Sequence, residues 1–281
     1  MRPIETKKEL DKILNRTPSS NTLGLVPTMG ALHKGHLALV KKAVQENDRV
    51  VVSIFVNPTQ FNNKEDLVKY PKDLSKDLEL IESVDPDIIV FAPSVEEIYA
   101  QSVRPKKYDF QGLDNVMEGE FRDDHFNGVG TIVEQLFSLI QPNNAYFGEK
   151  DFQQLRIIKK LVEIQKIPVN IIPCPIVRED HGLAMSSRNE RLSENIRLKA
   201  GFIFKTLQTA KEKFGTKSAL KVKEWVKNQF LKEEDFEMEY FEIADVETLS
   251  PLKRKVKNKK YRAFIAVYAE DIRLIDNIAL N

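Results

Sequence analysis

Two of the four histidines in this 281-residue sequence lie in one glycine-containing turn. The stretch LVPTMGALHKGHLALV, residues 25–40, leaves an apolar run at Gly30 and places His33 and His36 on either side of Gly35. Two imidazoles about one helical turn apart can both donate hydrogen bonds to a phosphate chain while charge accumulates on a departing group. The pattern therefore favours a site that stabilises leaving pyrophosphate.

Other interpretations of this turn fit the residues less well. Gly30 and Gly35 have P-loop spacing, but His36 and Leu37 stand where a P-loop has Lys and Ser or Thr. Without the hydroxyl that holds Mg²⁺, transfer of a γ-phosphate is not expected. A zinc site needs a third ligand, and the motif contains no carboxylate. Histidines that merely cap a turn remain an open alternative.

Polar clusters follow three further predicted strands. They lie in FVNPTQF (residues 55–61), YFGEKDFQQ (146–154) and GLAMSSRNERLS (182–193). The ligand crevice of an open α/β sheet lies beyond the carboxyl ends of its strands, where such turns gather. We therefore expect these clusters to share one crevice with the two histidines.

Each cluster contains side chains suited to part of a nucleotide-dependent reaction. The amides Asn57 and Gln60 can orient hydroxyls and a carboxylate. Lys150 can reach a phosphate, and Asp151 can cap a helix or accept hydrogen bonds from ribose hydroxyls. Gln154 lies one helical turn further on. Taken singly, each segment is equally compatible with an ordinary capped turn or helix start.

The third cluster offers a grip for polyphosphate. Ser186, Ser187 and Arg188 place two hydroxyls and a guanidinium in three consecutive residues. A helix cap beside a surface arginine would explain the same residues if they stood alone.

Alternating strands and helices predict the fold that holds these clusters. Near-continuous apolar runs such as RVVVSIFV indicate buried parallel strands, and amphipathic stretches such as GHLALVKKAVQEN indicate helices between them. Residues 1–176 therefore predict a Rossmann-like α/β domain. Residues 177–281 predict a smaller α+β domain with helices at 193–214 and 217–231, followed by antiparallel strands in FEMEYFEIADV and YRAFIAVYAEDIRLID.

Composition gives no sign of a nucleic-acid or membrane partner. Lysine and arginine number 43 against 42 acidic residues, and no apolar run is long enough to span a membrane. A soluble, cytoplasmic protein is expected, because the N-terminus has no signal-peptide pattern. The basic run at residues 251–262 is interpreted as a solvated loop, with nucleic-acid binding kept as an alternative. Cys174, the only cysteine, is interpreted as an inert core residue.

Taken together, the motifs resemble those of the pantothenate synthetase family, the pantoate–β-alanine ligases of the nucleotidyltransferase superfamily. PTMGALHKGH, SIFVNPTQF, FGEKDFQQL and GLAMSSRN occur in the family's order and spacing over most of the chain. The resemblance implies condensation of pantoate with β-alanine, with Mg²⁺ and ATP, through a pantoyl adenylate. It also implies a homodimer, a Rossmann-like nucleotidyltransferase domain and a C-terminal lid domain.

The resemblance assigns roles position by position. His36 would be the proton donor, and His33, Lys150 and Arg188 would complete the catalytic set. Gln60 and Gln154 would bind pantoate, Gln60 would also touch β-alanine, and Asn57 would shape that pocket. The implied ATP site comprises Met29, Gly30, Ala31, Leu32, His33, Lys34, Gly35, His36, Gly148, Glu149, Lys150, Asp151, Val177, Met185, Ser186, Ser187 and Arg188, with no metal ligand from the protein.

Some positions depart from the family pattern. Lys34 stands where glutamate is common, Asp123 and Asp124 replace a Pro-Gly pair, and His181 looks like an extra residue. His125 and His181 are interpreted as structural or loop residues. A related nucleotidyltransferase that acts on a phosphorylated acceptor is the alternative enzyme, but it would lack the pair Gln60 and Gln154.

Overall fold

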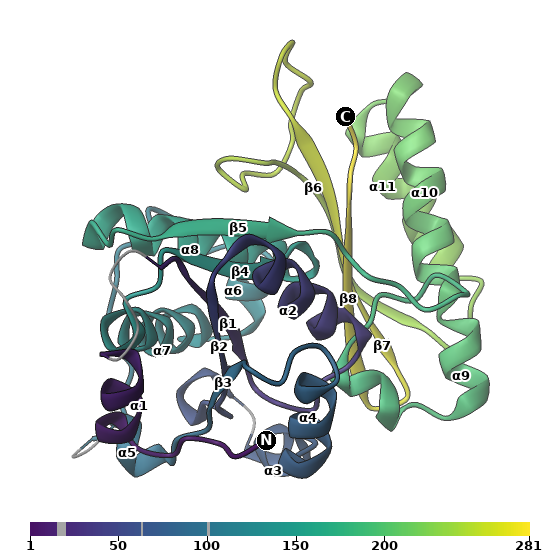
Figure 1. Ribbon diagram of the computed structural model, residues 1–281. Helices are drawn as coiled ribbons and strands as arrows, with labels where there is room; N and C mark the ends of the chain where they lie inside the picture. Colours follow the sequence, from purple (N-terminus) through teal and green to yellow (C-terminus); the bar gives the residue numbers. More distant parts are fainter. Residues whose placement is uncertain (16–20, 63, 100–101) are drawn as a thin grey trace.

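Parallel apolar strands form the centre of the N-terminal part of the chain. A computed structural model describes residues 1–15, 21–62, 64–99 and 102–281. Within these ranges, five parallel strands pair in the order β3-β2-β1-β4-β5 (Figure 1). They are β1 (Leu23–Thr28), β2 (Arg49–Ile54), β3 (Ile89–Phe91), β4 (Asn144–Gly148) and β5 (Asn170–Cys174). This order places a topological switch point between β1 and β4.

Neighbouring residues of these strands face opposite helical layers. Val26 and Val52 pack with α2 (Lys34–Glu46) and α4 (Leu74–Glu82), whereas Leu25 and Val51 pack in a second cluster on the other face. The helices on that face are α1 (Lys7–Leu14), α7 (His125–Ile140) and α8 (Phe152–Gln165). Because side chains alternate along a strand, burial on both faces requires the continuous apolar runs seen in the sequence.

Short helices occupy several connections of this unit. They are α3 (Lys64–Lys69), α5 (Val95–Tyr99), α6 (Glu118–Phe121) and the 3₁₀ turns η1 (Pro58–Gln60), η2 (Glu149–Asp151) and η3 (Ser187–Arg191). The sequence analysis did not predict them, because one or two turns are too few to show a helical period. Three of the four polar clusters lie on η1, η2 and η3.

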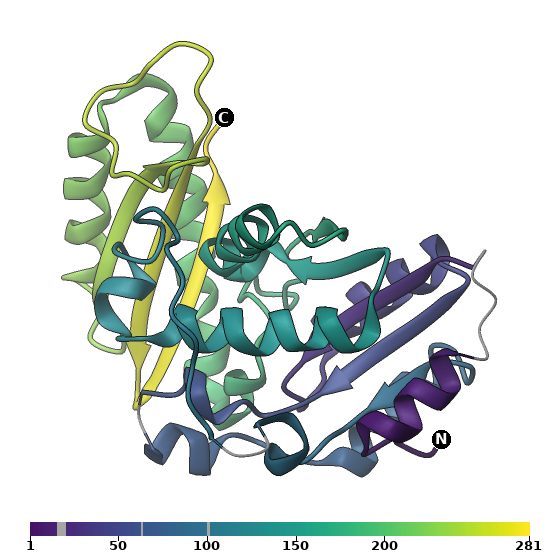
Figure 2. The same ribbon diagram turned by 90° about the vertical axis from the view of Figure 1, so that its left-hand side faces the viewer.

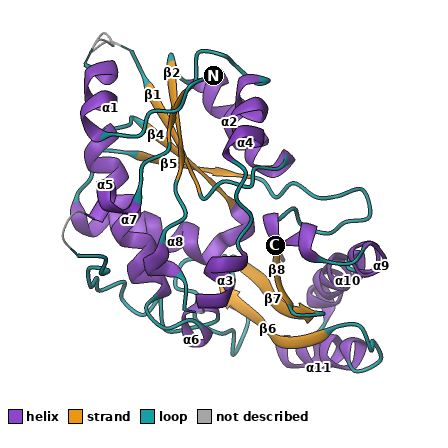
Figure 3. Cartoon of the chain, turned by 90° about the horizontal axis from the view of Figure 1, so that it is seen from below, coloured by secondary structure: helices purple, strands orange, loops and turns teal. Residues whose placement is uncertain are grey.

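The C-terminal part forms a second sheet with its own helices. The strands β6 (Glu237–Asp245), β7 (Tyr261–Ala269) and β8 (Ile272–Ala279) are antiparallel in the order β6-β7-β8. Helices α10 (Gly201–Thr216) and α11 (Ala219–Phe230) cover the face turned away from the parallel sheet, and α9 (Glu194–Lys199) precedes them (Figures 1 and 3). The predicted fold class is therefore confirmed, while the boundary after residue 176 stays a prediction.

Two C-terminal elements differ from their predicted form. The single helix predicted at 193–214 is two helices that meet at Ala200, next to Gly201. A Cβ on Gly201 would lie 2.3 Å from the His181 carbonyl oxygen. The backbone segments around Gly201 and His181 are therefore closer together than any residue with a side chain would allow. The last predicted strand, 261–276, is a hairpin that turns at Glu270, where φ is +55°.

The two sheets share a packed contact. Ala244, Leu249 and Phe264 from the C-terminal unit belong to the same apolar cluster as α7 and α8, and the rotated view shows the two units side by side (Figure 2). Residues 251–260 of the basic run are mostly exposed, as expected of a solvated loop. Arg262, at the end of the run, is instead buried and pairs with Glu149 at 3.2 Å, which corrects its assignment to that loop.

The single cysteine lies in the apolar core. Cys174 is 2% exposed, and burial raises the pKa of its thiol to about 11, as expected of an inert core residue. None of the helices in the described ranges is long and apolar enough to cross a membrane.

Candidate active site

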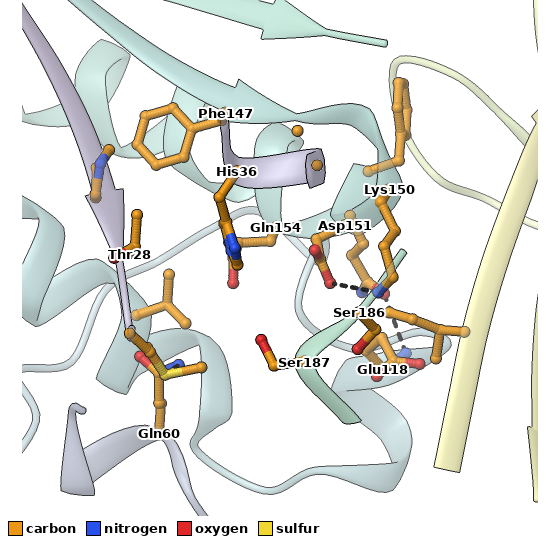
Figure 4. A pocket seen from close by; sticks show the side chains of 18 of the residues that line it. Thr28, His36, Gln60, Glu118, Phe147, Lys150, Asp151, Gln154, Ser186 and Ser187 are labelled. Atoms are coloured by element: carbon orange, nitrogen blue, oxygen red, sulfur yellow. Dashed lines mark hydrogen bonds and ion pairs between the residues drawn. The ribbon is translucent and has the colours of Figure 1, made fainter. Parts of the chain in front are cut away.

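One cavity opens at the switch point between β1 and β4. The turn after β1 contributes His33 and His36, and the turn after β4 contributes Lys150 and Asp151. Figure 4 shows His36, Gln60, Gln154 and Ser187 arranged around the same space. This placement follows from the strand order, since helices on either side of a switch point diverge and leave a crevice.

The two imidazoles lie against each other at the start of α2. Their ring centroids are 4.1 Å apart with a 32° tilt. His33 is the N-cap of α2, and its Nδ1 accepts a hydrogen bond from the Gly35 N–H at 3.1 Å. The Nε2 of a neutral His33 therefore carries the proton and can donate. A Cβ on Gly35 would lie 2.8 Å from the His33 ring, so glycine is needed for this cap.

A buried carboxylate, missed by the sequence analysis, holds the turn that precedes His33. Asp77 of α4 accepts hydrogen bonds from the N–H groups of Ala31 at 2.9 Å and Leu32 at 2.7 Å. Gly30 and Ala31 both have positive φ, +78° and +50°, a conformation that a non-glycine residue rarely adopts. The two hydrogen bonds to Asp77 help to hold this backbone conformation. They also occupy the N–H groups of Ala31 and Leu32, which are therefore not available to a ligand.

Burial keeps the histidines of this region uncharged. It lowers the pKa of His36 to about 3 and that of His33 to about 4, with the Lys150 charge adding to both shifts. The His36 Nδ1 is buried, and the described residues provide it with no hydrogen-bond partner. Neutral imidazoles can still donate one hydrogen bond each, and a bound polyphosphate would favour their protonation.

Stability should therefore fall on mild acidification. His33, His36 and His125 have lowered pKa values in the folded protein, so the unfolded chain binds more protons between about pH 4 and 6.5. Each group should reduce the free energy of unfolding by up to about 1.4 kcal/mol per pH unit as the pH falls through this window. Urea denaturation from pH 7 to 4.5 measures the slope. His125→Asn, which keeps a donor near Nδ1, should flatten it, and an unchanged slope would contradict the assignment for His125.

The turn after β4 is held by the C-terminal sheet. The Asn277 side-chain amide of β8 donates to the backbone carbonyls of Glu149 at 3.0 Å and Lys150 at 2.8 Å. The Lys150 ammonium lies 3.8 Å from the Asp151 carboxylate, and both side chains line the cavity with Gly148 (Figure 4). Glu149 points elsewhere and pairs with Arg262. Asn277 gave no sequence signal, because it lies on a strand remote in sequence.

The two amides of the cluster are buried and hydrogen-bonded to each other at the cavity wall. Asn57 is 1% exposed, and it donates to the Gln60 side-chain oxygen and to the Gly128 carbonyl, both at 3.1 Å. Its role is to hold Gln60, whose amide nitrogen lies 3.0 Å from the Met29 sulfur. His125 also supports this turn, since its Nδ1 lies 2.8 Å from the Gln60 carbonyl oxygen. This contact agrees with the structural role expected for His125.

The serine–arginine cluster, Ser186 to Arg188, forms part of the cavity wall next to the histidine turn. Ser187 donates to the Ala31 carbonyl at 3.0 Å and so ties η3 to the histidine turn. Arg188 donates to Asp66 of α3 at 2.8 Å and lies over the Tyr70 ring. Asp66, which also pairs with Arg191 at 3.3 Å, was not predicted as a site residue.

Most of the predicted site residues line this cavity. Those that do are Met29, His33, Gly35, His36, Asn57, Gln60, Gly148, Lys150, Asp151, Gln154, Val177, Met185, Ser186, Ser187 and Arg188. Gly30, Ala31, Leu32, Lys34 and Glu149 belong to the same turns but do not line it. The cavity wall also includes Glu118, Arg122, Tyr240 and Asp276, which the sequence analysis did not select. The individual roles of these residues stay predictions.

A parallel sheet of this order, with imidazole, lysine and hydroxyl groups at its switch point, defines a nucleotide-binding α/β enzyme. The sequence profile of the family described as pantoate-beta-alanine ligase matches residues 2–279. The chain therefore belongs to the pantoate-beta-alanine ligase family. Its enzyme class, a ligase of pantoate and β-alanine, confirms the expectation from the sequence and favours it over the alternative, a related enzyme that acts on a phosphorylated acceptor.

Relatives and solved structures are similar to this chain over all or nearly all of its length. Pantothenate synthetase of Christiangramia forsetii is 56% identical over 100% of both chains, and that of Flavobacterium psychrophilum is 58% identical over 92% of both. The crystal structure of the Thermus thermophilus enzyme aligns with a TM-score of 0.90 at 39% identity, covering 100% of this chain and 99% of that one. A Francisella tularensis ligase complexed with beta-gamma ATP and β-alanine gives 0.81 at 36%, covering 100% and 98%.

Proposed function

We propose that this chain activates pantoate with ATP and transfers the activated acid to β-alanine. One observation carries this proposal: a single cavity joins phosphate-directed groups, His33, His36 and Lys150, to the two amides Gln60 and Gln154. The nucleotide and β-alanine named for the Francisella tularensis structure support the same pair of substrates.

The reaction would proceed in two displacement steps. A pantoate carboxylate oxygen attacks the α-phosphorus of ATP, and the bond from that phosphorus to the bridging oxygen of pyrophosphate breaks. The ammonium group of β-alanine first loses a proton to solvent, and the neutral amine nitrogen then attacks the acyl carbon. The bond from that carbon to the AMP oxygen breaks with its electron pair, and the second proton of the nitrogen also passes to solvent. Pantothenate, AMP and pyrophosphate are the products.

The residues would act mainly by positioning and charge stabilisation. His36 and His33 would donate hydrogen bonds along the α,β-phosphate link, with proton donation from His36 once polyphosphate has raised its pKa. Lys150 and Arg188 would supply positive charge, and Ser186 and Ser187 would bind phosphate oxygens. Gln60 and Gln154 would hold pantoate.

Mg²⁺ would enter as part of the nucleotide substrate. Within the described ranges, no group of three or more His, Cys, Asp or Glu side chains is placed to hold a metal ion. Phosphate oxygens and water would therefore be its principal ligands, as is common for this ion.

Assembly and location belong to the same proposal. We place the enzyme in the cytoplasm as a homodimer formed through the N-terminal unit, which is what the family resemblance implies and the commonest oligomer symmetry supports. Light scattering after size exclusion would report a mass near twice that of the chain, 32.3 kDa.

Pyrophosphate release separates the two steps. With Mg²⁺, ATP and pantoate alone, we expect one small burst of about one equivalent per site. Adding β-alanine should convert the burst to sustained turnover with AMP and pantothenate. Absence of any release that depends on pantoate would contradict the adenylate route.

A further inference from the structure

Arg122 is a cation in the cavity wall for which neither the motifs nor the family resemblance supplies a role. It directly follows α6, its side chain is 26% exposed, and it lines the cavity beside Gln60. Among the described residues, the lysines and arginines that line this cavity are Arg122, Lys150 and Arg188.

The guanidinium of Arg122 is only loosely held. Its Nη2 lies 3.4 Å from the Gln60 carbonyl oxygen, and its Nη1 lies 3.7 Å from the Glu118 carboxylate. Both distances exceed the usual 2.7–3.2 Å of a good hydrogen bond. Glu118 cannot serve it better, because Arg273 binds both carboxylate oxygens at 2.7 and 2.8 Å and Tyr240 donates to one of them at 2.8 Å. Arg122 therefore keeps donors for a ligand.

The other two cations belong to the nucleotide side of the cavity. Lys150 stands on the turn after β4, and Arg188 stands on η3, which Ser187 ties to the histidine turn. In the proposed reaction both would face phosphates. Arg122 is instead joined to the Gln60 turn, on the side assigned to the two organic acids.

The acceptor substrate, β-alanine, has a negative charge that the protein must neutralise. β-alanine carries a carboxylate at the end opposite its reacting amine, and this group stays anionic throughout the reaction. A buried carboxylate needs a cation, and a guanidinium can bind its two oxygens through two parallel hydrogen bonds. The neutral amide of Gln60 cannot provide this charge.

We propose that Arg122 binds the carboxylate of β-alanine and thereby aims its amine at the acyl carbon. The inference rests on the proposed function and deepens it, because it assigns the group that selects a zwitterionic acceptor. An amine without the carboxylate would lose this anchor. Arg122 would then contribute to the second step and not to the first.

The test compares the two half-reactions in an Arg122→Gln variant, which keeps an amide donor for the Gln60 carbonyl but loses the charge. Pantoate-dependent exchange of pyrophosphate into ATP reports the first step, and we expect it to stay within about 3-fold of the unaltered enzyme. KM for β-alanine in the full reaction should rise roughly 10- to 150-fold, as expected for loss of a hydrogen-bonded charge. Arg122→Lys should recover part of this loss.

The acceptor can be altered as well as the enzyme. With 3-aminopropanamide, which has no carboxylate, the unaltered enzyme and Arg122→Gln should differ by less than about 3-fold in kcat/KM. Arg156→Gln is a matched control, since Arg156 is also largely buried but pairs with Glu247 outside the cavity. It should leave KM for β-alanine unchanged.

Three results would overturn the inference. An unchanged KM for β-alanine with normal exchange would overturn it alone. If Arg122→Gln lost pyrophosphate exchange to the same extent as it lost the full reaction, or if its KM for ATP rose as much as its KM for β-alanine, Arg122 would act in phosphate binding or in stabilising the fold. Absence of exchange in the unaltered enzyme would overturn the adenylate route and this inference with it.

Discussion

Replacing His36 by alanine should lower pantoate-dependent pyrophosphate release by about 100-fold or more, while the fold stays intact. His36 lies at the start of α2 with its ring 4.1 Å from that of His33, and its Nδ1 atom is buried with no hydrogen-bond partner among the described residues. A preorganised donor that meets charge only as it develops contributes about 3–4 kcal/mol to the transition state. Single-turnover release from ATP and pantoate is the measurement.

A second histidine provides the control for this substitution. His181 does not line the cavity, so His181→Ala should change the release rate less than about 3-fold. Thermal unfolding of both variants would exclude loss of the fold as a cause. Near-normal release in a folded His36→Ala protein would remove His36 from the mechanism.

Removing the Glu118 carboxylate should destabilise the protein by about 3–5 kcal/mol, the largest stability effect we expect. Glu118 is 6% exposed and joins α6 to the C-terminal sheet through Arg273 and Tyr240. Burial alone would raise its pKa, but the Arg273 bonds and the nearby Arg122 charge hold the pKa at about 2. Glu118→Ala would leave Arg273 with Glu239 as its remaining carboxylate partner and would remove the carboxylate nearest to Arg122, so that positive charge in this buried region is less well compensated.

Urea denaturation at pH 7 of Glu118→Ala, Arg273→Ala and the double variant tests this expectation. The double variant should lose less than the sum of the single variants, because the second substitution removes the charge that the first left less well compensated. Because the folded pKa of Glu118 is depressed, the difference from the unaltered protein should shrink below about pH 4.5. A loss under 1 kcal/mol for Glu118→Ala would contradict the prediction.

The parallel sheet and most of the cavity were predictable because both follow local rules. A run such as RVVVSIFV is apolar on both faces, and the polar clusters come directly after such runs. What could not be predicted depends on close approach or on pairing across long sequence distances. Gly201 packs against the His181 carbonyl, and Asp77 reaches the Ala31 turn from another helix. Neither contact leaves a periodic pattern.

The same reason explains which site residues were missed. Glu118 and Arg122 lie around α6, which is too short to show a period, and Asn277 acts through backbone carbonyls of a distant turn. The aspartates at 123 and 124 were noted only as departures from a Pro-Gly pair. Asp124 has a φ of +56°, the left-handed conformation that a glycine at this position would adopt without strain.

The ion pair between Arg188 and Asp66 has a consequence for the release of pyrophosphate. Arg188 pairs with Asp66 at 2.8 Å, so in the proposed reaction its binding to a phosphate would exchange one anionic partner for another. The exchange yields less net affinity than a bare guanidinium would, because the attraction to Asp66 must first be given up. The same competition would favour return of the arginine to Asp66 when pyrophosphate leaves. An arginine with no competing carboxylate would bind pyrophosphate more tightly and slow its release. Product release limits the turnover rate of many enzymes.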